Sequence, residues 1–168
     1  MLPITKVSSL ILELSEAINY SEIIKRIKIP FSEFSEYLNW NEQYYTRNCI
    51  VRTDQYELLL LCWEPGQFSP IHSHNKQECW VYIVEGELNE LQFQLNKQNL
   101  PEQFKAESLT KNNFYYTNDD LGLHSLSNLS SNRCVSLHLY AKPIDECQYF
   151  SEVTNSFKTK SLNYSSTK

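Results

Sequence analysis

Short stretches typical of β-strands follow one another from Tyr45 to Ala141, and no long helical segment separates them. Each stretch is rich in β-branched and aromatic residues and is bounded by turn residues. Successive short strands without intervening helices are typical of antiparallel barrels and sandwiches. The sequence therefore predicts a mainly β fold, with strands near residues 45–52, 56–63, 79–86, 88–95, 113–118 and 134–141.

The N-terminal residues 1–40 predict a short helical segment instead. Apolar residues recur there at helical spacing between residues 10 and 27, and Pro30 suits the start of a third short helix. Acidic residues within the first apolar stretch argue against a signal peptide. We expect a single domain over residues 1–168, with the barrel at 44–150 and a loose polar tail at 158–168.

Composition excludes several classes of function. Hydrophobic residues make up 41% of the chain, enough to build a core, and the net charge of -5 argues against nucleic-acid binding. The longest apolar run, Leu58 to Trp63, has the length of a strand and not of a membrane span. The five cysteines form no CxxC motif and no disulfide framework, which favours a reducing compartment. We expect a cytoplasmic monomer with no membrane partner.

The placement of the histidines points to chemistry. His72 and His74 are two residues apart, so on a strand both imidazoles face the same side. His124 follows about fifty residues later in the segment GLHSLSN. A single histidine is usually an ordinary core or surface residue, but these three together favour a metal site. Neutral imidazoles suit iron, zinc, copper and nickel alike, so the pattern alone leaves the metal open.

The same residues resemble the two sequence motifs of the cupins, small β-barrels of the jelly-roll type that hold a metal inside. Gly66, His72, His74 and Gly86 match the spacing of the first motif, and GLHSLSN, which contains His124, resembles the second. The resemblance implies a cupin fold with a short N-terminal helical segment.

Many metal cupins carry a glutamate ligand shortly after the second histidine, where this chain has Glu78 and Cys79. The distance to Gly86 places Cys79, and not Glu78, at the usual ligand position. Neighbouring residues of a strand face opposite sides, so an inward Cys79 requires an outward Glu78. We expect Glu78 to be a solvated carboxylate that does not bind the metal. Three neutral histidines would then leave the full charge of the ion free to accept a thiolate.

Several further stretches resemble cysteine dioxygenase, from about residue 44 to residue 150. They are YTRN at residues 45–48, Cys62-Trp63, LGLHSLSN, and SLHLYAKPIDEC at residues 136–147. The resemblance implies that Arg47 and Tyr45 bind the substrate carboxylate and that the Tyr140 hydroxyl lies over the metal. It also implies that a thioether between Cys79 and Tyr140 can form. Trp63 and Cys147 are then expected in the pocket, with Cys147 in a structural role.

Ser136, His138 and Tyr140 alternate along one strand and therefore share one face, opposite the apolar residues Val135, Leu137 and Leu139. Such a row is either a hydrogen-bonded relay into a cavity or a polar stripe facing solvent, and spacing alone leaves both open. The resemblance implies the relay, with these three residues in catalytic roles.

The resemblance thus implies an iron(II) thiol dioxygenase of cysteine catabolism, with one ion per chain on His72, His74 and His124. It would oxidise L-cysteine with O2 to cysteine sulfinate, the second step of thiol oxidation. The similar 3-mercaptopropionate dioxygenases usually have glutamine at the position of Arg47, so Arg47 favours cysteine as the substrate. The alternatives are a dioxygenase for another small thiol, a different metal cupin with Glu78 as a fourth ligand, and a metal-free cupin that binds or senses a small acid.

Overall fold

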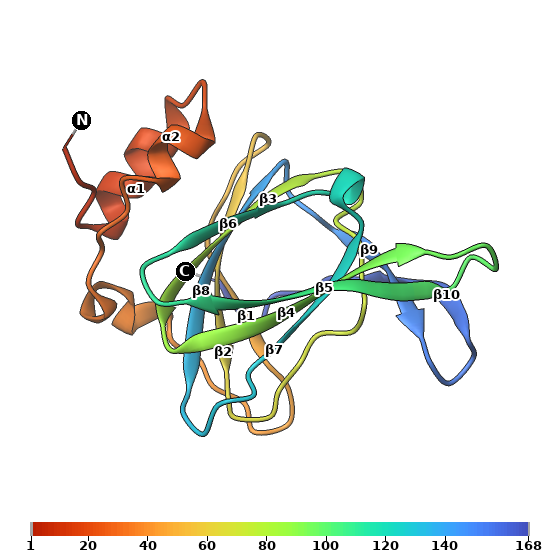
Figure 1. The fold of residues 1–168 in the computed structure, drawn as a ribbon. Helices are drawn as coiled ribbons and strands as arrows, with labels where there is room; N and C mark the ends of the chain where they lie inside the picture. The colour runs from red at the N-terminus through yellow and green to blue at the C-terminus, as the bar shows by residue number, and fades with distance from the viewer. Residues whose placement is uncertain (1, 168) are drawn as a thin grey trace.

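The computed structural model describes residues 2–167, and its N-terminal part is helical as the sequence predicts. Helix α1 covers Val7–Ser15 and α2 covers Tyr20–Ile24, and the 3-10 helix η1 at Phe31–Tyr37 follows Pro30. Both α-helices lie on one side of the strands (Figure 1). Within the described residues, no helix is long and apolar enough to cross a membrane.

The rest of the described chain is built mainly from β-strands, which confirms the mainly β prediction (Figure 1). All of the strands predicted from the sequence are present. The bounds are β1 Thr46–Arg52, β2 Glu57–Trp63, β3 Glu78–Glu85, β4 Glu87–Leu95, β5 Pro101–Thr110, β6 Phe114–Thr117, β7 Leu123–Ser127, β8 Cys134–Ala141, β9 Glu146–Ser151, β10 Ser156–Ser161 and β11 Ser166–Thr167; a 3-10 helix, η2, covers Asp119–Leu121.

One layer of the barrel is a six-stranded sheet with the order β11-β1-β2-β8-β3-β6. Strands β2 and β8 lie in its centre and are buried on both faces. This explains why β2 consists of a continuous apolar run, since a strand covered on both sides has no polar face to alternate with. The register pairs Leu59 with His138 and Leu61 with Ser136, so apolar and polar pocket residues lie side by side.

The second layer joins the strands β5-β4-β7 to the hairpin β9-β10 through the irregular segment 68–73. This segment forms isolated backbone bridges, one between Phe68 and Ser127 and one between His72 and His124. His72 also bridges to Tyr149 on β9. The backbone of a predicted metal-binding residue thus links two parts of the layer that are far apart in the sequence.

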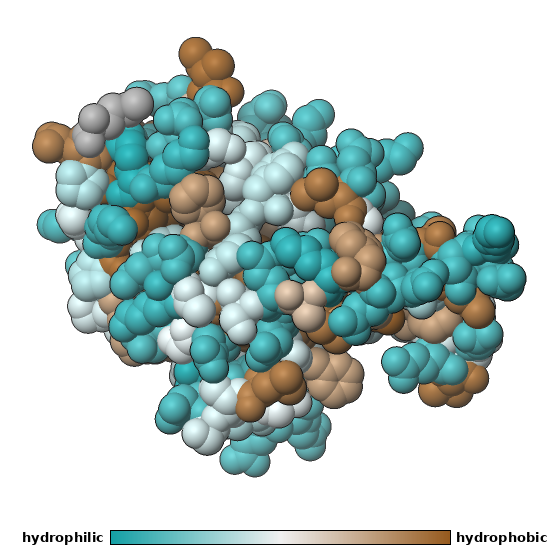
Figure 2. Space-filling model, viewed as in Figure 1, coloured by the Kyte–Doolittle hydropathy of each residue, from teal (hydrophilic) through white to brown (hydrophobic). Residues whose placement is uncertain are grey.

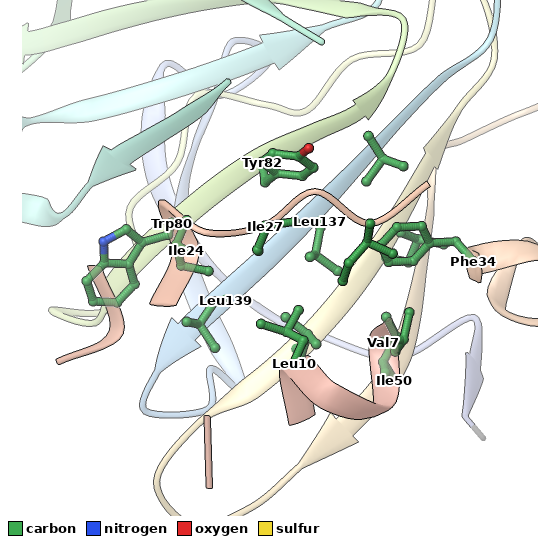
Figure 3. Close-up of a cluster of buried hydrophobic side chains, with 14 of the residues drawn as sticks. Val7, Leu10, Ile24, Ile27, Phe34, Ile50, Trp80, Tyr82, Leu137 and Leu139 are labelled. Atoms are coloured by element: carbon green, nitrogen blue, oxygen red, sulfur yellow. The ribbon is translucent and has the colours of Figure 1, made fainter. Parts of the chain in front are cut away.

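Apolar side chains gather inside the molecule, while the surface in Figure 2 is largely hydrophilic with scattered apolar residues. One core cluster lies between the helices and the outer face of the six-stranded sheet (Figure 3). There Leu10 of α1 and Phe34 of η1 pack with Leu137 and Leu139 of β8. Burial of such side chains contributes about 1.5–3 kcal/mol each to folding, so this layer fixes the sheet that carries the site.

A second cluster fills the barrel interior, and strand β2 contributes to both clusters. Leu58 and Leu60 face the helices, whereas Leu59, Leu61 and Trp63 face the interior. Alternation with a period of two therefore divides one apolar strand between two cores. The interior cluster is the one that surrounds the histidines.

The expectation of a loose tail at residues 158–168 is wrong for the residues that the structure describes. Strand β10 pairs with β9, and β11 pairs in parallel with β1. The Ser165 N–H donates to the carbonyl of Arg47 over 2.7 Å. Polar composition suggested a tail because both strands pair on one side only and leave most of their side chains exposed. For the same reason the polar edge strand β5 was not predicted.

Candidate metal centre and substrate pocket

The structure brings together His72, His74 and His124, the three histidines that the sequence singled out. One side-chain nitrogen of each lies within 4.8 Å of the others, a group that could hold a metal ion. The ring centroids are 4.6 Å apart for His72 and His124 and 5.4 Å apart for His72 and His74. His124 is on β7, whereas His72 lies in the irregular segment that pairs with it and His74 directly follows that segment.

Hydrogen bonds fix which nitrogen two of these rings present. The Nδ1 of His72 lies 2.9 Å from the Pro70 carbonyl, and the Nδ1 of His124 lies 2.6 Å from Oε1 of Glu90. A carbonyl or carboxylate accepts, so in the neutral rings both Nδ1 atoms carry the proton and both Nε2 atoms keep a lone pair. A carboxylate or carbonyl behind the ring is the usual support of a histidine that binds a metal.

The three histidines fit a metal ion in spacing and in charge. The Nε2 atoms of His74 and His124 are 3.0 Å apart, and two nitrogen ligands about 2.1 Å from one ion and at right angles lie about 3.0 Å apart. Burial, together with the neighbouring His124, lowers the pKa of His72 to about 3 and that of His74 well below its usual value. The rings of His72 and His74 are therefore neutral near pH 7, as a metal ligand must be.

The turn after His74 is held by Asp119, a residue that the sequence analysis did not single out. Its carboxylate accepts from the backbone N–H groups of His74 and Lys76, each over 2.6 Å. Asn75 and Lys76 both have left-handed backbone angles, with φ of 52° and 64°. The histidine pair was expected on a strand, but it lies at the start of this turn, and both rings still face the same space.

Cys79 and Glu78 point in opposite directions, as the alternation of β3 predicts. Cys79 is fully buried in the interior cluster, whereas Glu78 is exposed and accepts a hydrogen bond from the Tyr116 hydroxyl over 2.9 Å. The histidine cluster does not include Glu78. A glutamate ligand at this position therefore has no support in the geometry of the described residues.

The row on β8 faces the interior and forms a relay that begins at Trp63. The indole Nε1–H of Trp63 donates to Ser136 Oγ over 2.9 Å, and Ser136 Oγ lies 2.8 Å from His138 Nε2. Val135, Leu137 and Leu139 face the opposite core, so the alternative of a solvent-facing polar stripe is wrong. Burial, with the charge of Arg47, lowers the pKa of His138 to about 3, so its ring is neutral as well.

Tyr140 ends the relay row and lies beside the histidine cluster. Its ring centroid is 5.9 Å from that of His74 and 6.2 Å from that of His138. Cys79 is its direct partner across β3 and β8. Burial raises the pKa of both side chains, so the phenol and the thiol are protonated at neutral pH. The structure therefore places a hydroxyl donor at the metal side of the cavity with a thiol next to it.

Arg47 is a buried cation on the wall of this cavity, and its side chain is 12% exposed. Within residues 2–167, its Nε and Nη2 atoms are buried and have no hydrogen-bond partner. These two nitrogens lie on the same edge of the guanidinium, the edge that can donate two parallel hydrogen bonds to a carboxylate; we call it the open edge of Arg47. Tyr45 lies on the same wall and stacks on Trp63 at 4.2 Å between ring centroids.

The cavity that joins these groups has a volume of about 40 Å³ and adjoins an outer cleft of about 730 Å³. Tyr45, Arg47 and Lys160 line both spaces, so the side chain of Arg47 forms part of the wall between the cleft and the cavity. Cys147 is buried on the cavity wall as expected. So small a cavity suits a ligand of a few heavy atoms.

Two buried carboxylates near the cavity were missed. Glu90 supports His124 from β4, and Glu57 lies 3.7 Å from Arg47 Nη2 at the start of β2. The sequence does hold a signal that Glu57 is buried. Glu57, Leu59, Leu61 and Trp63 are spaced two apart on one strand and share a face, and the three apolar side chains point into the barrel interior. An acidic residue in phase with inward apolar residues indicates a buried and partnered carboxylate.

The two layers, with an internal histidine cluster that could hold a metal ion, define a cupin. Comparison with known families then identifies the branch. The sequence model of the family "Cysteine dioxygenase type I" matches residues 8–153, and the chain belongs to this family.

Curated relatives agree with this assignment. The chain is 34% identical over 127 residues to cysteine dioxygenase type 1 of Rattus norvegicus, a match that covers 73% of this chain and 64% of the rat protein. The Homo sapiens protein gives the same identity and coverage. The chain therefore spans somewhat less than two thirds of these relatives. The Danio rerio protein is 30% identical over 158 residues, or 89% of this chain and 79% of that protein.

Solved structures support the fold alone. A protein with a double-stranded β-helix domain from Klebsiella pneumoniae has a TM-score of 0.54 at 15% identity, covering 76% of this chain and 94% of that chain. A cupin 2 domain-containing protein from Halorhodospira halophila has a TM-score of 0.52 at 17% identity, covering 68% of this chain and 76% of that one. Both likenesses confirm the predicted cupin architecture.

Proposed function

We propose that this protein is an iron(II) thiol dioxygenase that converts L-cysteine and O2 to cysteine sulfinate. One observation carries the proposal: Arg47, whose open edge has no hydrogen-bond partner in the described residues, lines the same small cavity as the three histidines. Such a cavity offers a place for a carboxylate and a place for a metal-bound thiolate within one small molecule. Membership of the cysteine dioxygenase family and the names of the curated relatives support the same reaction.

In this proposal His72, His74 and His124 hold one iron(II) ion per chain. The bound ion supplies the one-electron chemistry that lets O2 react with a thiolate. Three neutral ligands leave the positive charge of the ion uncompensated, which favours an anionic sulfur as a further ligand. The Glu90 carboxylate behind His124 keeps that ring in one tautomer and orientation.

Arg47 binds the substrate carboxylate through its open edge, and Tyr45 adds a hydrogen bond from the same wall. A planar guanidinium matches both oxygens of a carboxylate, which the single ammonium of a lysine would not. Trp63 fixes the Tyr45 ring by stacking. The thiol end of cysteine is then directed towards the histidines, because the cavity is lined by both groups. Cys147 forms part of the wall and has a structural role.

The row formed by Ser136, His138 and Tyr140 supplies hydrogen-bond donors to the reacting groups. Ser136 donates to His138 Nε2, so the neutral His138 carries its proton on Nδ1, which has no hydrogen-bond partner among the described residues. Tyr140 remains protonated and can donate its hydroxyl hydrogen to oxygen that approaches the metal. Both groups are donors held by the rigid central strand of the sheet, and such preorganised donors are effective in a site shielded from water.

We also propose that Cys79 and Tyr140 become joined by a thioether. An S–C bond would form between the Cys79 sulfur and the Tyr140 ring, while the S–H bond and one ring C–H bond break. Two electrons and two protons would pass to O2 as the oxidant. Their direct pairing across β3 and β8 supports this step.

The function is tested by loading the metal-free protein with iron(II) under anaerobic conditions and then adding air with L-cysteine or 3-mercaptopropionate. We expect O2 uptake and sulfinate formation in equal amounts, with L-cysteine preferred. The His124→Ala variant should lose the activity and Glu78→Gln should retain it. Equal rates on the two thiols would contradict the role of Arg47. An iron-loaded protein that oxidises neither thiol would overturn the proposal and favour the binding or sensor alternative.

The remaining expectations belong to the same proposal. All five cysteines are buried free thiols in the structure, which supports a reducing cytoplasmic setting. The net charge of -5 supports small-molecule partners over nucleic acids. A monomer is proposed, and its mass in solution tests it.

A further inference from the structure

Glu57 is a buried carboxylate that lies beside the guanidinium of Arg47 and outside the lining of the cavity. Its side chain has no exposed surface, and its Oε1 atom is 3.7 Å from Arg47 Nη2. Its Oε2 atom is 3.6 Å from Nη1 of a second arginine, Arg52. A buried carboxylate needs such partners, because an isolated charge in the interior is strongly destabilising.

The position of this carboxylate is set by hydrogen bonds that do not involve Arg47. The backbone N–H of Ile144 donates to Oε1 over 3.2 Å, and the Tyr164 hydroxyl donates to Oε2 over 2.5 Å. Burial, with the hydrogen bond to Glu57, raises the pKa of Tyr164 to about 12, so its hydroxyl remains a donor. The carboxylate therefore stays in place whether or not Arg47 binds a ligand.

Glu57 attracts the guanidinium of Arg47 without occupying its open edge. The 3.7 Å separation is that of an ion pair and not of a hydrogen bond. Nη2 carries two hydrogens, and the Nε and Nη2 donors have no hydrogen-bond partner in the part of the chain that the structure describes. The pair thus holds the arginine and partly neutralises it while the edge stays available to a ligand.

We propose that Glu57 is a positioning and specificity-determining residue that limits how tightly Arg47 holds anions, so that the product can leave. This inference rests on the proposed function. Cysteine enters with one carboxylate, and cysteine sulfinate carries a second, ionised acid group. A fixed negative charge beside Arg47 lowers the affinity for both, because the thiolate of the bound substrate and the sulfinate of the product each add a negative charge to the carboxylate. The weaker binding lets the product dissociate.

The test compares ligand binding to the wild type and to Glu57→Gln, which keeps the shape of the side chain and removes its charge. Calorimetry under anaerobic conditions on the iron-loaded protein measures the Kd of L-cysteine sulfinate and of cysteamine, a thiol without a carboxylate. We expect the sulfinate to bind Glu57→Gln roughly three- to tenfold more tightly, as for a partly screened charge contact, and cysteamine to bind unchanged. In turnover, KM for L-cysteine should fall while the rate with cysteamine stays constant.

Asp145→Asn is the matched control, since Asp145 is an exposed acid that pairs with Arg52. It should leave the Kd of the sulfinate unchanged. If Glu57→Gln binds the sulfinate no more tightly, or alters cysteamine equally, the inference is wrong. If Glu57→Gln does not fold, Glu57→Asp decides, because it withdraws the charge from Arg47 by one methylene group. Tighter sulfinate binding by Glu57→Asp supports the inference, and unchanged binding overturns it.

These readouts separate the inference from the proposed function. A protein that oxidises no thiol but binds the sulfinate more tightly after Glu57→Gln would refute the function and keep the role of Glu57. A protein that oxidises cysteine, but whose sulfinate affinity does not change in Glu57→Gln, would support the function and refute the role of Glu57.

Discussion

The indole N–H of Trp63 donates to the hydroxyl oxygen of Ser136 over 2.9 Å, and the same oxygen lies 2.8 Å from Nε2 of His138. The indole N–H occupies one lone pair of the hydroxyl, and within the described residues His138 Nε2 is the acceptor in reach of its hydrogen. We infer that Ser136 donates to His138, which is then the tautomer with its proton on Nδ1. Trp63 thus orients the Ser136 hydroxyl and through it favours one tautomer of His138.

Replacing Trp63 by phenylalanine should release this control. We expect His138 to become a mixture of both neutral tautomers, because without the indole N–H the Ser136 hydroxyl is free to rotate and can turn either its hydrogen or a lone pair towards His138 Nε2. The lost hydrogen bond and the smaller ring should lower the free energy of unfolding by about 1–3 kcal/mol. Nitrogen-15 NMR of the histidine rings reports the tautomer, and urea unfolding reports the stability. An unchanged His138 spectrum would show that Trp63 does not act through Ser136.

Glu90→Gln should weaken metal binding without abolishing it. The amide no longer attracts the Nδ1 proton of His124 as a charged acceptor, and loss of such a supporting carboxylate typically costs 10- to 100-fold in metal affinity. Competition with a chelator, read by metal analysis of the dialysed protein, measures the change. Glu78→Gln is the control, since this exposed carboxylate lies outside the histidine cluster. An equal loss in both variants would contradict the role assigned to Glu90.

The proposed thioether should be visible in the mass of the intact protein. After turnover with iron, L-cysteine and O2, part of the wild type should lose the mass of a pair of hydrogen atoms. Cys79→Ser should show no such loss, and Cys134→Ser, which alters another buried thiol, should still show it. Peptide mapping would place the link between Cys79 and Tyr140, and a link elsewhere would refute the assignment.

The metal-free protein should lose stability as the pH falls from 6.5 towards 5. The folded pKa values of His72 and His138 are about 3, below the unfolded value. At pH values between the two, the unfolded chain binds protons at these histidines and the folded chain does not. Stability is then full above the unfolded pKa and falls with decreasing pH, by at most about 1.4 kcal/mol per pH unit for each group. Urea unfolding at several pH values measures this slope, and His138→Gln should reduce it. An equal slope in the variant would exclude His138 as a source.

Much of the site could be predicted from the sequence because its spacing is local. The alternation of Ser136, His138 and Tyr140 survives any arrangement of the surrounding sheets. The same holds for Cys79 and Glu78, whose opposite directions follow from adjacency on one strand. His72 and His74 lie at a turn and not on a strand, and their rings meet because a single residue separates them.

The supporting groups could not be predicted, since they depend on contacts between distant segments. Glu90 reaches His124 across 34 positions and Glu57 reaches Tyr164 across 107, and no local pattern encodes either pair. The prediction of a loose tail at the end of the chain was wrong for a related reason. Strands β10 and β11 are polar, and what orders them is backbone pairing with β9 and β1, which composition does not report.

His72 and His124 exchange backbone hydrogen bonds in both directions, 2.9 Å and 3.1 Å long. The main chain therefore brings the two imidazoles together, with their ring centroids 4.6 Å apart. Variants without a given imidazole should keep their shape, so loss of catalysis need not mean loss of the protein. A scaffold of this kind can lose its metal, or exchange one ligand for another, and still be inherited as a folded domain on which new chemistry arises.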